Sequence, residues 1–421
     1  MQNATELIKD LKQAGAKAYL VGGCVRDTVL GHKPKDFDIA TSMPIDGVVA
    51  LFKDKHNVVP VGKEFGVVRV FVQGIDYQIA TFRKDGTYKD GRRPESVEFT
   101  DDVKEDASRR DFTINAMYMD PETGEILDFF GGKDHLSRGL LKTVGDPYAR
   151  FQEDKLRMLR AVRFSTRFGF GIHDYVVDAI HDLSPKLTQV SGERIQDELR
   201  QILGSKERVS ALQALGHLGL LRYIFPELSK MYSAHKSPAL FTSYKPEEWV
   251  MLCSSLDRCQ NFGPKSLAQI VGLLYSHVPV GYLYQDSILD DLKFNYEEHF
   301  VVKQCAELKI PHDRKSYEAH RFFGGLFVIE VIETLAARSE NPAKTKLEWL
   351  EDFMWHCHKA PLKLRDRPIV TGKLLVDYGM KPSEEFGSIL AKAAKAQFEG
   401  ELNECNKFEW LRKEIATRAG I

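Results

Sequence analysis

Short apolar runs that are rich in β-branched residues dominate the first 140 residues of the chain. Gly and Asp, which favour turns, interrupt the runs AYLVGG, DIAT, VVRVFV and YQIATF. This pattern predicts a small mixed sheet with a few helices. The N-terminal segment MQNATELIKDLKQAGAK places charged residues among apolar ones and predicts an amphipathic helix that leads into the first strand.

The pattern changes near residue 145. From GDPYARFQEDKLRMLRAVRF onward, apolar residues recur at spacings of three and four, as at Leu156, Leu159 and Val162. This period continues to the C-terminus and predicts helices. Gly and Pro residues divide them at Gly204-Ser205, Pro226, Gly263-Pro264, Pro279, Pro311 and 361–368. The expected fold class is therefore α+β, with a small mixed sheet at the head and all-helical domains after it.

The composition narrows the class of protein. The 421 residues are enough for two to three domains at ~150 residues each. No stretch of eighteen consecutive apolar residues is present, so a membrane-spanning protein is not expected, and the N-terminus does not resemble a signal or transit peptide. The six cysteines form no C-x-x-C pair, which favours a reducing cytoplasm over a disulfide framework or a zinc ribbon.

A nucleic-acid partner would need a local basic patch, because the net charge of the chain is only -1. One such patch exists. Residues 138–167 contain eight basic residues against three acidic ones, Asp146, Glu153 and Asp154. The basic residues are Arg138, Lys142, Arg150, Lys155, Arg157, Arg160, Arg163 and Arg167.

Two motifs in the head carry candidate chemistry. In YLVGGCVRD a strand runs into Gly22 and Gly23 and then into a helix, so that backbone N–H groups and the helix N-terminus can approach a phosphate. A plain strand-to-helix turn is the alternative for this motif alone. Asp36 and Asp38 follow, and carboxylates two residues apart on a strand point to the same face. Such a pair can hold two divalent ions that activate a hydroxyl and stabilise a leaving pyrophosphate.

These residues resemble a known family. The segment LVGGCVRDTVLGHKPKDFDIAT is similar to the head motif of the class II tRNA nucleotidyltransferases, which are the CCA-adding enzymes, and of the related bacterial poly(A) polymerases. The resemblance continues, in order, through RRDFTINAM (109–117), GDPYARFQEDKLRMLRAVRF (145–164) and SGERIQDEL (191–199). It implies a nucleotidyltransferase head of the polymerase β type, followed by a helical neck, body and tail.

The resemblance also implies roles for individual residues. Asp36 and Asp38 would be the catalytic pair that binds two Mg²⁺ ions. Gly22, Gly23 and Arg26 would hold the triphosphate of the incoming nucleotide, while Arg110 and Asp111 would contact its ribose with help from Asn115. Glu153, Asp154 and Arg157, with Arg160 nearby, would complete the nucleotide site as a protein template for the base.

The template role has a chemical basis. Placed on one helix, Asp154 and Arg157 would share a face at a spacing of three, with Glu153 turned about a third of the way around. The resemblance implies that Glu153 orients Arg157. A carboxylate accepts and a guanidinium donates, which complements the amino group and ring nitrogen of cytosine and adenine but not the reversed edge of uracil and guanine. An exposed ion pair is the alternative. Glu193 and Arg194, after Ser191, are interpreted as capping and packing residues.

One position departs from the family pattern. Relatives usually have Glu where this chain has Gln78, and a neutral amide supplies neither a third negative charge nor a base. Either Asp36 and Asp38 are enough to hold the metal ions, which we favour, or the nearby Asp76 supplies the missing negative charge.

Three functions share parts of this pattern: a CCA-adding enzyme, a poly(A) polymerase or partial CC- or A-adding enzyme, and a non-catalytic RNA-binding protein. The metal aspartates disfavour the last. Asp90-Gly91-Arg92 resembles the loop that CCA-adding relatives use to switch from CTP to ATP, and residues 370–402 resemble their tail. The expected partners are the tRNA 3′ end, CTP and ATP. The expected domains are the catalytic head (1–140), neck (141–205), body (206–340) and tail (341–421), the last two binding tRNA.

Overall fold

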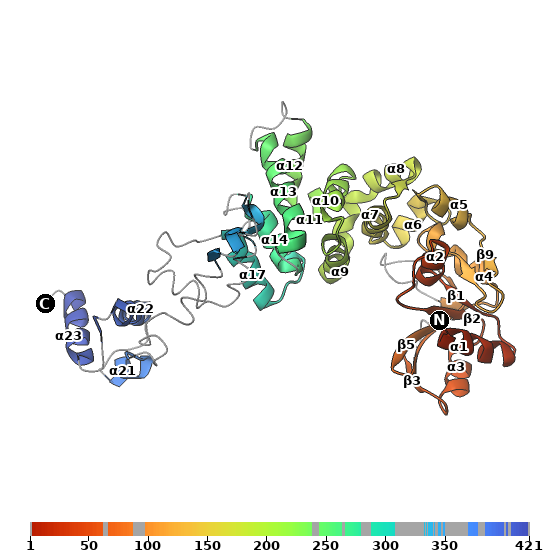
Figure 1. Ribbon diagram of the computed structural model, residues 1–421, viewed down its shortest axis with the longest axis horizontal. Helices are drawn as coiled ribbons and strands as arrows, with labels where there is room; N and C mark the ends of the chain where they lie inside the picture. The colour runs from red at the N-terminus through yellow and green to blue at the C-terminus, as the bar shows by residue number, and fades with distance from the viewer. Residues whose placement is uncertain are drawn as a thin grey trace. The chain divides into compact units, whose positions relative to one another are not determined.

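The computed structural model groups the chain into two compact units, of which the first comprises Met1–Cys253 with Gly281–Phe294 and the second Ser254–Val280 with Asn295–Ile421 (Figure 1). The residues it describes are 2–61, 66–86, 97–237, 244–262, 266–278, 288–307, short stretches between 332 and 349, 369–377, 384–399, 401–402 and 406–419. Both functional recesses considered below lie in the first unit.

The head is built on a seven-stranded mixed sheet with the order β3-β4-β5-β2-β1-β8-β9. Only β2 and β5 pair in parallel, and the other pairings in this sheet are antiparallel. The strands are β1 (Ala18–Val21), β2 (Asp38–Thr41), β3 (Asn57–Pro60), β4 (Val67–Val72), β5 (Ile75–Thr81), β8 (Tyr118–Met119) and β9 (Ile126–Leu127). Two smaller sheets pair β6 (Arg83–Asp85) with β7 (Val97–Phe99) and β10 (Leu140–Leu141) with β11 (Gly171–Ile172). The predicted mixed sheet is therefore confirmed.

Short helices surround this sheet. The predicted N-terminal amphipathic helix is α1, which buries Ala4, Leu7, Ile8 and Leu11 and leads into β1 as expected. The other helices of the head are α2 (Gly23–Val29), α3 (Ile45–Phe52), α4 (Val103–Ser108) and α5 (Gly132–Ser137), with a 3₁₀ turn η2 at Thr113–Asn115. Helix α1 itself spans Gln2–Gln13. The apolar faces of these short helices and the sheet form the core of the head.

The glycine turn between β1 and α2 needs its glycine. Gly22 has a φ of 75°, a left-handed conformation that side chains with a Cβ rarely adopt. The N–H of Gly22 donates to the Met117 carbonyl at 3.3 Å, so the turn is joined to the segment that follows η2. A Cβ on Gly22 would also lie 3.5 Å from Nη1 of Arg110. The turn thus brings the two predicted nucleotide-binding motifs into contact.

Helices follow the head in the first unit, as the apolar spacing predicted (Figure 1). They are α6 (Pro147–Glu153), α7 (Arg157–Phe168), α8 (Asp174–Leu183), α9 (Gly192–Leu203), α10 (Arg208–His217), α11 (Leu221–Ile224), α12 (Pro226–Lys236), α13 (Pro246–Phe262) and α16 (Ile288–Asp291), with a 3₁₀ helix η3 at Ser184–Gln189. Residues 254–262 of α13 are assigned to the second unit. The predicted breaks at Gly204 and Pro226 are confirmed, because α9 ends at Leu203 and α12 begins at Pro226. The other predicted breaks lie outside the described residues.

One prediction about these helices is wrong. Asp154 and Arg157 do not share a helix, because α6 ends at Glu153 and α7 begins at Arg157. Asp154 has an extended backbone, with φ of −142° and ψ of 104°, and its carboxylate accepts from the backbone N–H of Leu156 at 3.1 Å. This local hydrogen bond is the type by which Asp competes with helical structure.

The second unit is also helical. Its helices are α14 (Leu267–Tyr275), α17 (Tyr296–Glu307), α21 (Gly372–Asp377), α22 (Glu384–Glu399) and α23 (Lys407–Ala419). Ser266 and Gln269 form a capping box at the start of α14, and α14 packs on α17. A separate apolar cluster includes Leu375, Ile389 and Leu411. Within the described part of the chain, none of the helices combines the length and apolar character needed to span a bilayer.

Candidate active site

A recess of about 470 Å³ lies where the head meets the first helices of the neck, and it gathers most of the predicted site residues. From the head it is lined by Gly22, Gly23, Arg26, Asp38, Arg110, Asp111 and Asn115. From the neck it is lined by Asp154, Arg157 and Arg160. Asp36, two residues before Asp38, and Glu153, next to Asp154, do not line the recess themselves. Asp90, Gly91 and Arg92 lie outside the described residues.

The two candidate metal ligands stand at the start of β2. Asp38 is its first residue, and Asp36 precedes the strand, so the expectation that both lie within one strand is wrong. Both are exposed, and within the described part of the chain neither carboxylate accepts a hydrogen bond or forms an ion pair. Desolvation by the surrounding protein atoms raises the pKa of Asp38, and so does the charge of Asp36, although Arg110 opposes the shift. Among the described residues, the two carboxylates therefore have no ion-pair partner, and Arg110 acts on Asp38 without forming an ion pair.

Gln78 is the direct neighbour of this pair. Asp38 is in register with Gln78 across the parallel β2–β5 pairing, and residues in register on adjacent strands point to the same face. On the next strand, Arg69 is in register with Gln78 but forms an ion pair with Asp76 instead. Asp76 is therefore engaged by Arg69, which favours the interpretation that Asp36 and Asp38 act without its help.

Arg26 is held rigidly inside the recess. It is only 4% exposed, and its Nη1 donates to Oδ1 of Asn115 at 2.6 Å while Nε donates to Oδ1 of Asp27 at 2.8 Å. Its guanidinium also lies over the ring of Phe168, 4.6 Å from the centroid. Burial lowers the pKa of Arg26, and Asp27 opposes that shift. Planar stacking and paired hydrogen bonds fix the orientation of this cation.

A buried carboxylate that the sequence analysis missed orients Arg110. Asp106 on α4 is 1% exposed and accepts from Nη2 of Arg110 at 3.2 Å and from the hydroxyl of Tyr118. Arg110 also donates from Nε to the Tyr118 hydroxyl at 3.0 Å. Burial opposes the effect, but Arg109 and Arg110 hold the pKa of Asp106 below its usual value. Its position four residues before Arg110, which follows the end of α4, is the only sequence signal that could have revealed it.

A second buried network joins the head to the neck. Asp111 accepts from Asn115 at 3.1 Å and, through Oδ2, from Nε of Arg160 at 2.8 Å. Burial opposes ionisation of Asp111, yet Arg160 and Asn115 lower its pKa to about 2. On the neck side, Glu198 of α9 lies 3.6 Å from Arg160 and 2.9 Å from Arg163. Burial raises the pKa of Glu198 despite these two cations.

The template residues are positioned by contacts around the break between α6 and α7. Nη1 of Arg157 donates to Oε2 of Glu153 at 2.7 Å and to the Arg150 carbonyl at 3.2 Å, and Nη2 donates to the Arg109 carbonyl at 3.0 Å. These contacts use three of the five guanidinium N–H groups. The expected pairing of Glu153 with Arg157 is therefore present, and it brings Arg157 up against the end of α4.

Arg194 belongs to this site, contrary to its interpretation as a capping and packing residue. Its Nη1 donates to Oδ1 of Asp154 at 3.1 Å and its Nη2 to Oδ2 at 2.8 Å, and it lines the recess. Ser191, the residue before α9, makes no capping hydrogen bond with its side chain. Arg163 and Arg167 also line the recess, so several cations face a space that they share with the unpaired carboxylate of Asp38.

Comparison with known proteins agrees with this geometry. The family described as "Poly A polymerase head domain" matches residues 18–142, and the family described as "Probable RNA and SrmB- binding site of polymerase A" matches residues 169–231. The first match contains the glycine turn, both aspartates and the Arg110-Asp111 motif. The second begins at the end of α7.

Two curated relatives are named CCA-adding enzymes. The protein of Geobacillus stearothermophilus is 41% identical over 261 residues, which is 61% of this chain and 63% of the relative. The chain thus spans less than two thirds of the length of that relative. The protein of Leuconostoc mesenteroides is 30% identical over 417 residues, covering 98% of this chain and 96% of the relative.

A solved structure shares the fold throughout. The CCA-adding enzyme of Bacillus stearothermophilus in complex with CTP aligns with a TM-score of 0.73 and 28% identity. The alignment covers 100% of this chain and 98% of that one. The α+β class expected from the hydrophobic pattern is confirmed by this match together with the seven-stranded mixed sheet.

Proposed function

Because this chain belongs to the family of CCA-adding enzymes, we propose that it adds the CCA sequence to the 3′ end of tRNA from CTP and ATP. The observation that carries the proposal is the recess that Asp38, Asp154 and Arg157 line together, with Asp36 two residues before Asp38. A metal site alone would suit any nucleotidyl transfer. The paired acceptor and donor beside it suit selection of cytosine and adenine without a nucleic-acid template.

The reaction is transfer of a nucleotidyl group. The 3′-hydroxyl oxygen of the RNA forms a bond to the α-phosphorus of the nucleotide, the bond from that phosphorus to the bridging oxygen of the β-phosphate breaks, and pyrophosphate leaves. The hydroxyl proton passes to solvent. The main task of the protein is then to align the hydroxyl with the α-phosphorus and to stabilise the charge of the leaving group.

Membership of this family implies the use of a divalent metal ion, and the carboxylates at the start of β2 fit such an ion. Asp36 and Asp38 present carboxylate oxygens that have no partner among the described residues, and hard cations such as Mg²⁺ prefer such ligands. We propose that the two aspartates hold two Mg²⁺ ions. When bound, these ions would supply a lowered pKa for the attacking hydroxyl and charge neutralisation for the pyrophosphate. The Gln78 amide beside Asp38 adds a neutral oxygen but no charge.

The cations of the recess provide the rest of the nucleotide site. We assign the triphosphate to the Gly22-Gly23 turn and to Arg26, whose orientation Asn115 and Asp27 fix. We assign the ribose contacts to Arg110 and Asp111, with help from Asn115. Asp106 and Tyr118 hold Arg110 in place. Arg160 is committed to Asp111 and Glu198, so its contribution would be to hold Asp111 in place.

Base selection is assigned to Asp154 and Arg157. The two remaining N–H groups of Arg157 can donate to the ring nitrogen of cytosine or adenine, while Asp154 can accept from the exocyclic amino group. Uracil and guanine present the opposite order and would leave buried groups unpaired, which can cost a factor of about 10⁴ in selectivity.

The remaining assignments concern which domains bind the tRNA and where in the cell the protein acts. We propose that the head (1–140) carries catalysis, that the neck (141–205) holds the base template, and that the body (206–340) and tail (341–421) bind the tRNA. The four cysteines among the described residues are free thiols, in keeping with a role in the cytoplasm.

The decisive experiment compares substrates. Purified protein is incubated with Mg²⁺ and tRNA that lacks its 3′ end, with CTP and ATP separately and together. We expect a product that is three nucleotides longer only when both are present. Long A-tails made from ATP alone on unstructured RNA would instead establish the alternative function, polyadenylation, and a product that ends at CC would establish a partial enzyme.

A further inference from the structure

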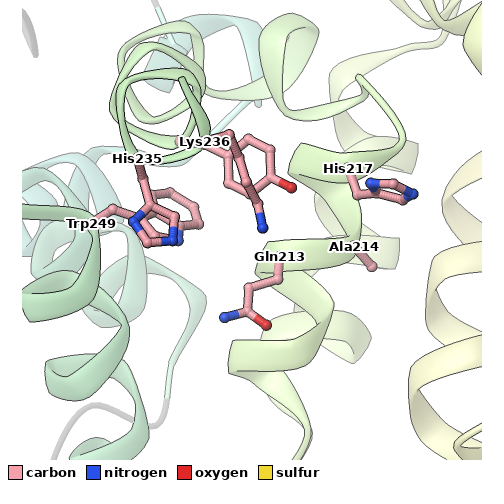
Figure 2. Close-up of a pocket in the computed structure, with 7 residues that line it drawn as sticks. Gln213, Ala214, His217, His235, Lys236 and Trp249 are labelled. Carbon is pink, nitrogen blue, oxygen red and sulfur yellow. The ribbon is translucent and has the colours of Figure 1, made fainter. Parts of the chain in front are cut away.

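A second recess, of about 270 Å³, lies between α10, α12 and α13 and has no part in the reaction described above (Figure 2). All of its lining belongs to the first unit of the chain. Figure 2 shows Lys236 extending from α12 and Gln213 from α10 into the space between the helices. We propose that this recess binds a backbone phosphate of the RNA substrate, an inference that rests on the proposed function.

The chemistry of the lining selects an anion. Lys236 brings a positive charge, and His235, His217 and Gln213 add ring and amide N–H donors. Among the residues that line the recess, none is acidic. Within the described part of the chain, Lys236 is in contact with the ring of Tyr232, 5.7 Å from its centroid, and takes part in no ion pair. Its charge is therefore available to a ligand.

The aromatic floor of the recess is fixed by packing. The rings of Tyr232 and Trp249 meet edge to face with their centroids 5.1 Å apart, and Trp249 is only 2% exposed. On the other side, a Cβ at Gly216 would lie 2.8 Å from the Tyr232 ring, so the glycine permits close contact between α10 and α12. The recess is thus a built feature whose walls keep their positions without a ligand.

An RNA backbone fits this recess better than a free nucleotide does. Gln213, His217 and Lys236 are all exposed, so the recess opens to solvent and a polymer could pass across it. A volume of about 270 Å³ is below the usual range of small-molecule sites, about 300–1,000 Å³, but holds a phosphate with its adjacent sugar. Phosphate contacts from Lys, amide and ring N–H groups are the commonest polar contacts to nucleic acids.

The position of the recess supports the same partner. Helix α10 packs on α7, which carries Arg157 and Arg160, and α12 packs on α10. The recess is therefore one helical layer away from the nucleotide site, along the helices that follow the head (Figure 1). A phosphate bound there would hold the RNA at a second point, remote from its 3′ end.

The test measures RNA binding without catalysis. The dissociation constant of full-length protein for tRNA lacking CCA is determined without nucleotide, over salt concentrations from about 50 to about 200 mM. We expect Lys236→Ala to weaken binding by about three- to tenfold and to reduce the slope of log affinity against log salt by about one. Lys236→Arg should restore both. Lys9→Ala, which removes an exposed lysine of α1, is the matched control and should leave both unchanged.

A second variant introduces repulsion with little change in shape. Gln213→Glu places a carboxylate in the recess and should weaken tRNA binding at least as much as Lys236→Ala, while the control Gln2→Glu, at an exposed position of α1, should not. Unchanged tRNA affinity and salt slope in both recess variants would overturn the proposal. The proposal would also be overturned if the recess variants bound CMP or pyrophosphate more weakly but tRNA as tightly as the wild type. The recess would then be a site for free nucleotides.

The binding test is independent of the proposed activity. If the wild-type protein binds tRNA without extending it, the proposed function fails while the comparison of variants still decides the role of the recess. If the protein adds CCA but Lys236→Ala and Gln213→Glu bind tRNA like the wild type, only the inference about the recess fails.

Discussion

Arg194 binds both oxygens of the Asp154 carboxylate, at 3.1 and 2.8 Å, from a helix that begins almost forty residues further along the chain. A carboxylate has about four acceptor positions, so this bidentate contact fixes its plane and still leaves positions for a base. Arg194 thus holds Asp154 in place, which makes it a positioning residue for the base template proposed above. Its own place depends on Gly192, where a Cβ would lie 1.7 Å from the Asp291 carbonyl oxygen, so no larger residue fits there without movement.

The first prediction concerns the metal ligands. Asp36→Ala or Asp38→Ala should abolish incorporation of CMP and AMP alike, because both ions need the shared carboxylates. The affinity for tRNA should stay nearly unchanged, since we assign the RNA contacts to the body and tail. Primer extension and filter binding on the same preparations check the two parts. Extension at more than a trace rate by the double variant would show that the assignment is wrong.

The second prediction concerns selection of the base. Asp154→Ala and Arg157→Ala should lose more discrimination against UTP and GTP than rate with CTP, because the metal ligands stay in place. Arg194→Ala should give a weaker form of the same defect, since Asp154 remains but is no longer held. Ratios of kcat/KM for CTP and UTP measure the effect. An Asp154 variant as selective as the wild type would contradict the template role.

The third prediction concerns the departure at Gln78. Gln78→Glu adds a carboxylate in register with Asp38 and should be tolerated or should raise the rate, most clearly at low Mg²⁺. Its rate is measured against Mg²⁺ concentration beside the wild type. An inactive variant that folds normally by circular dichroism would mean that the amide itself has a dedicated role.

The fourth prediction concerns Asp90, Gly91 and Arg92, which lie outside the described residues. If these residues switch the site from CTP to ATP, replacing all three by glycines should stall extension after CC. Product lengths on a sequencing gel give the answer directly. The loop has no such role if the variant completes CCA at the wild-type rate.

The fifth prediction concerns pH and the buried pair of Asp111 with Arg160. The pKa of Asp111 is about 2 in the folded protein against an ordinary value of 3.8, so ionisation stabilises the folded state fully above pH 3.8. This contribution, about 2 kcal/mol, is lost as the pH falls from 3.8 toward 2. At neutral pH, Asp111→Asn should therefore be less stable than the wild type.

The test is urea unfolding of both proteins between about pH 5 and about pH 2.5. The free energy of unfolding of the wild type should exceed that of Asp111→Asn by a constant amount at the upper end of this pH range. The difference should narrow at the lower end, because protonation of Asp111 removes the same charge from the wild type. A constant difference over the whole range would contradict the assignment.

The local parts of this fold could be predicted from the sequence, because short-range patterns determine them. Alternating and β-branched runs predicted β1, β2, β4 and β5, and the glycines after β1 predicted the turn into α2. Motif residues from four separate segments were expected at one site, and the structure places Gly22, Asp38, Arg110 and Arg157 around one recess.

Only the tertiary structure decided how these residues are held. Phe151 and Leu156 are five residues apart, so the apolar spacing is interrupted there, but only the structure shows that residues 154–156 separate α6 from α7 and that Asp154 is extended. The pairing of Asp154 with Arg194, and of Arg160 with Asp111 and Glu198, joins segments whose separation in sequence carries no information about distance. Long polar side chains have many partners in reach, and the packing of α7 on α9 and on the head selects one set.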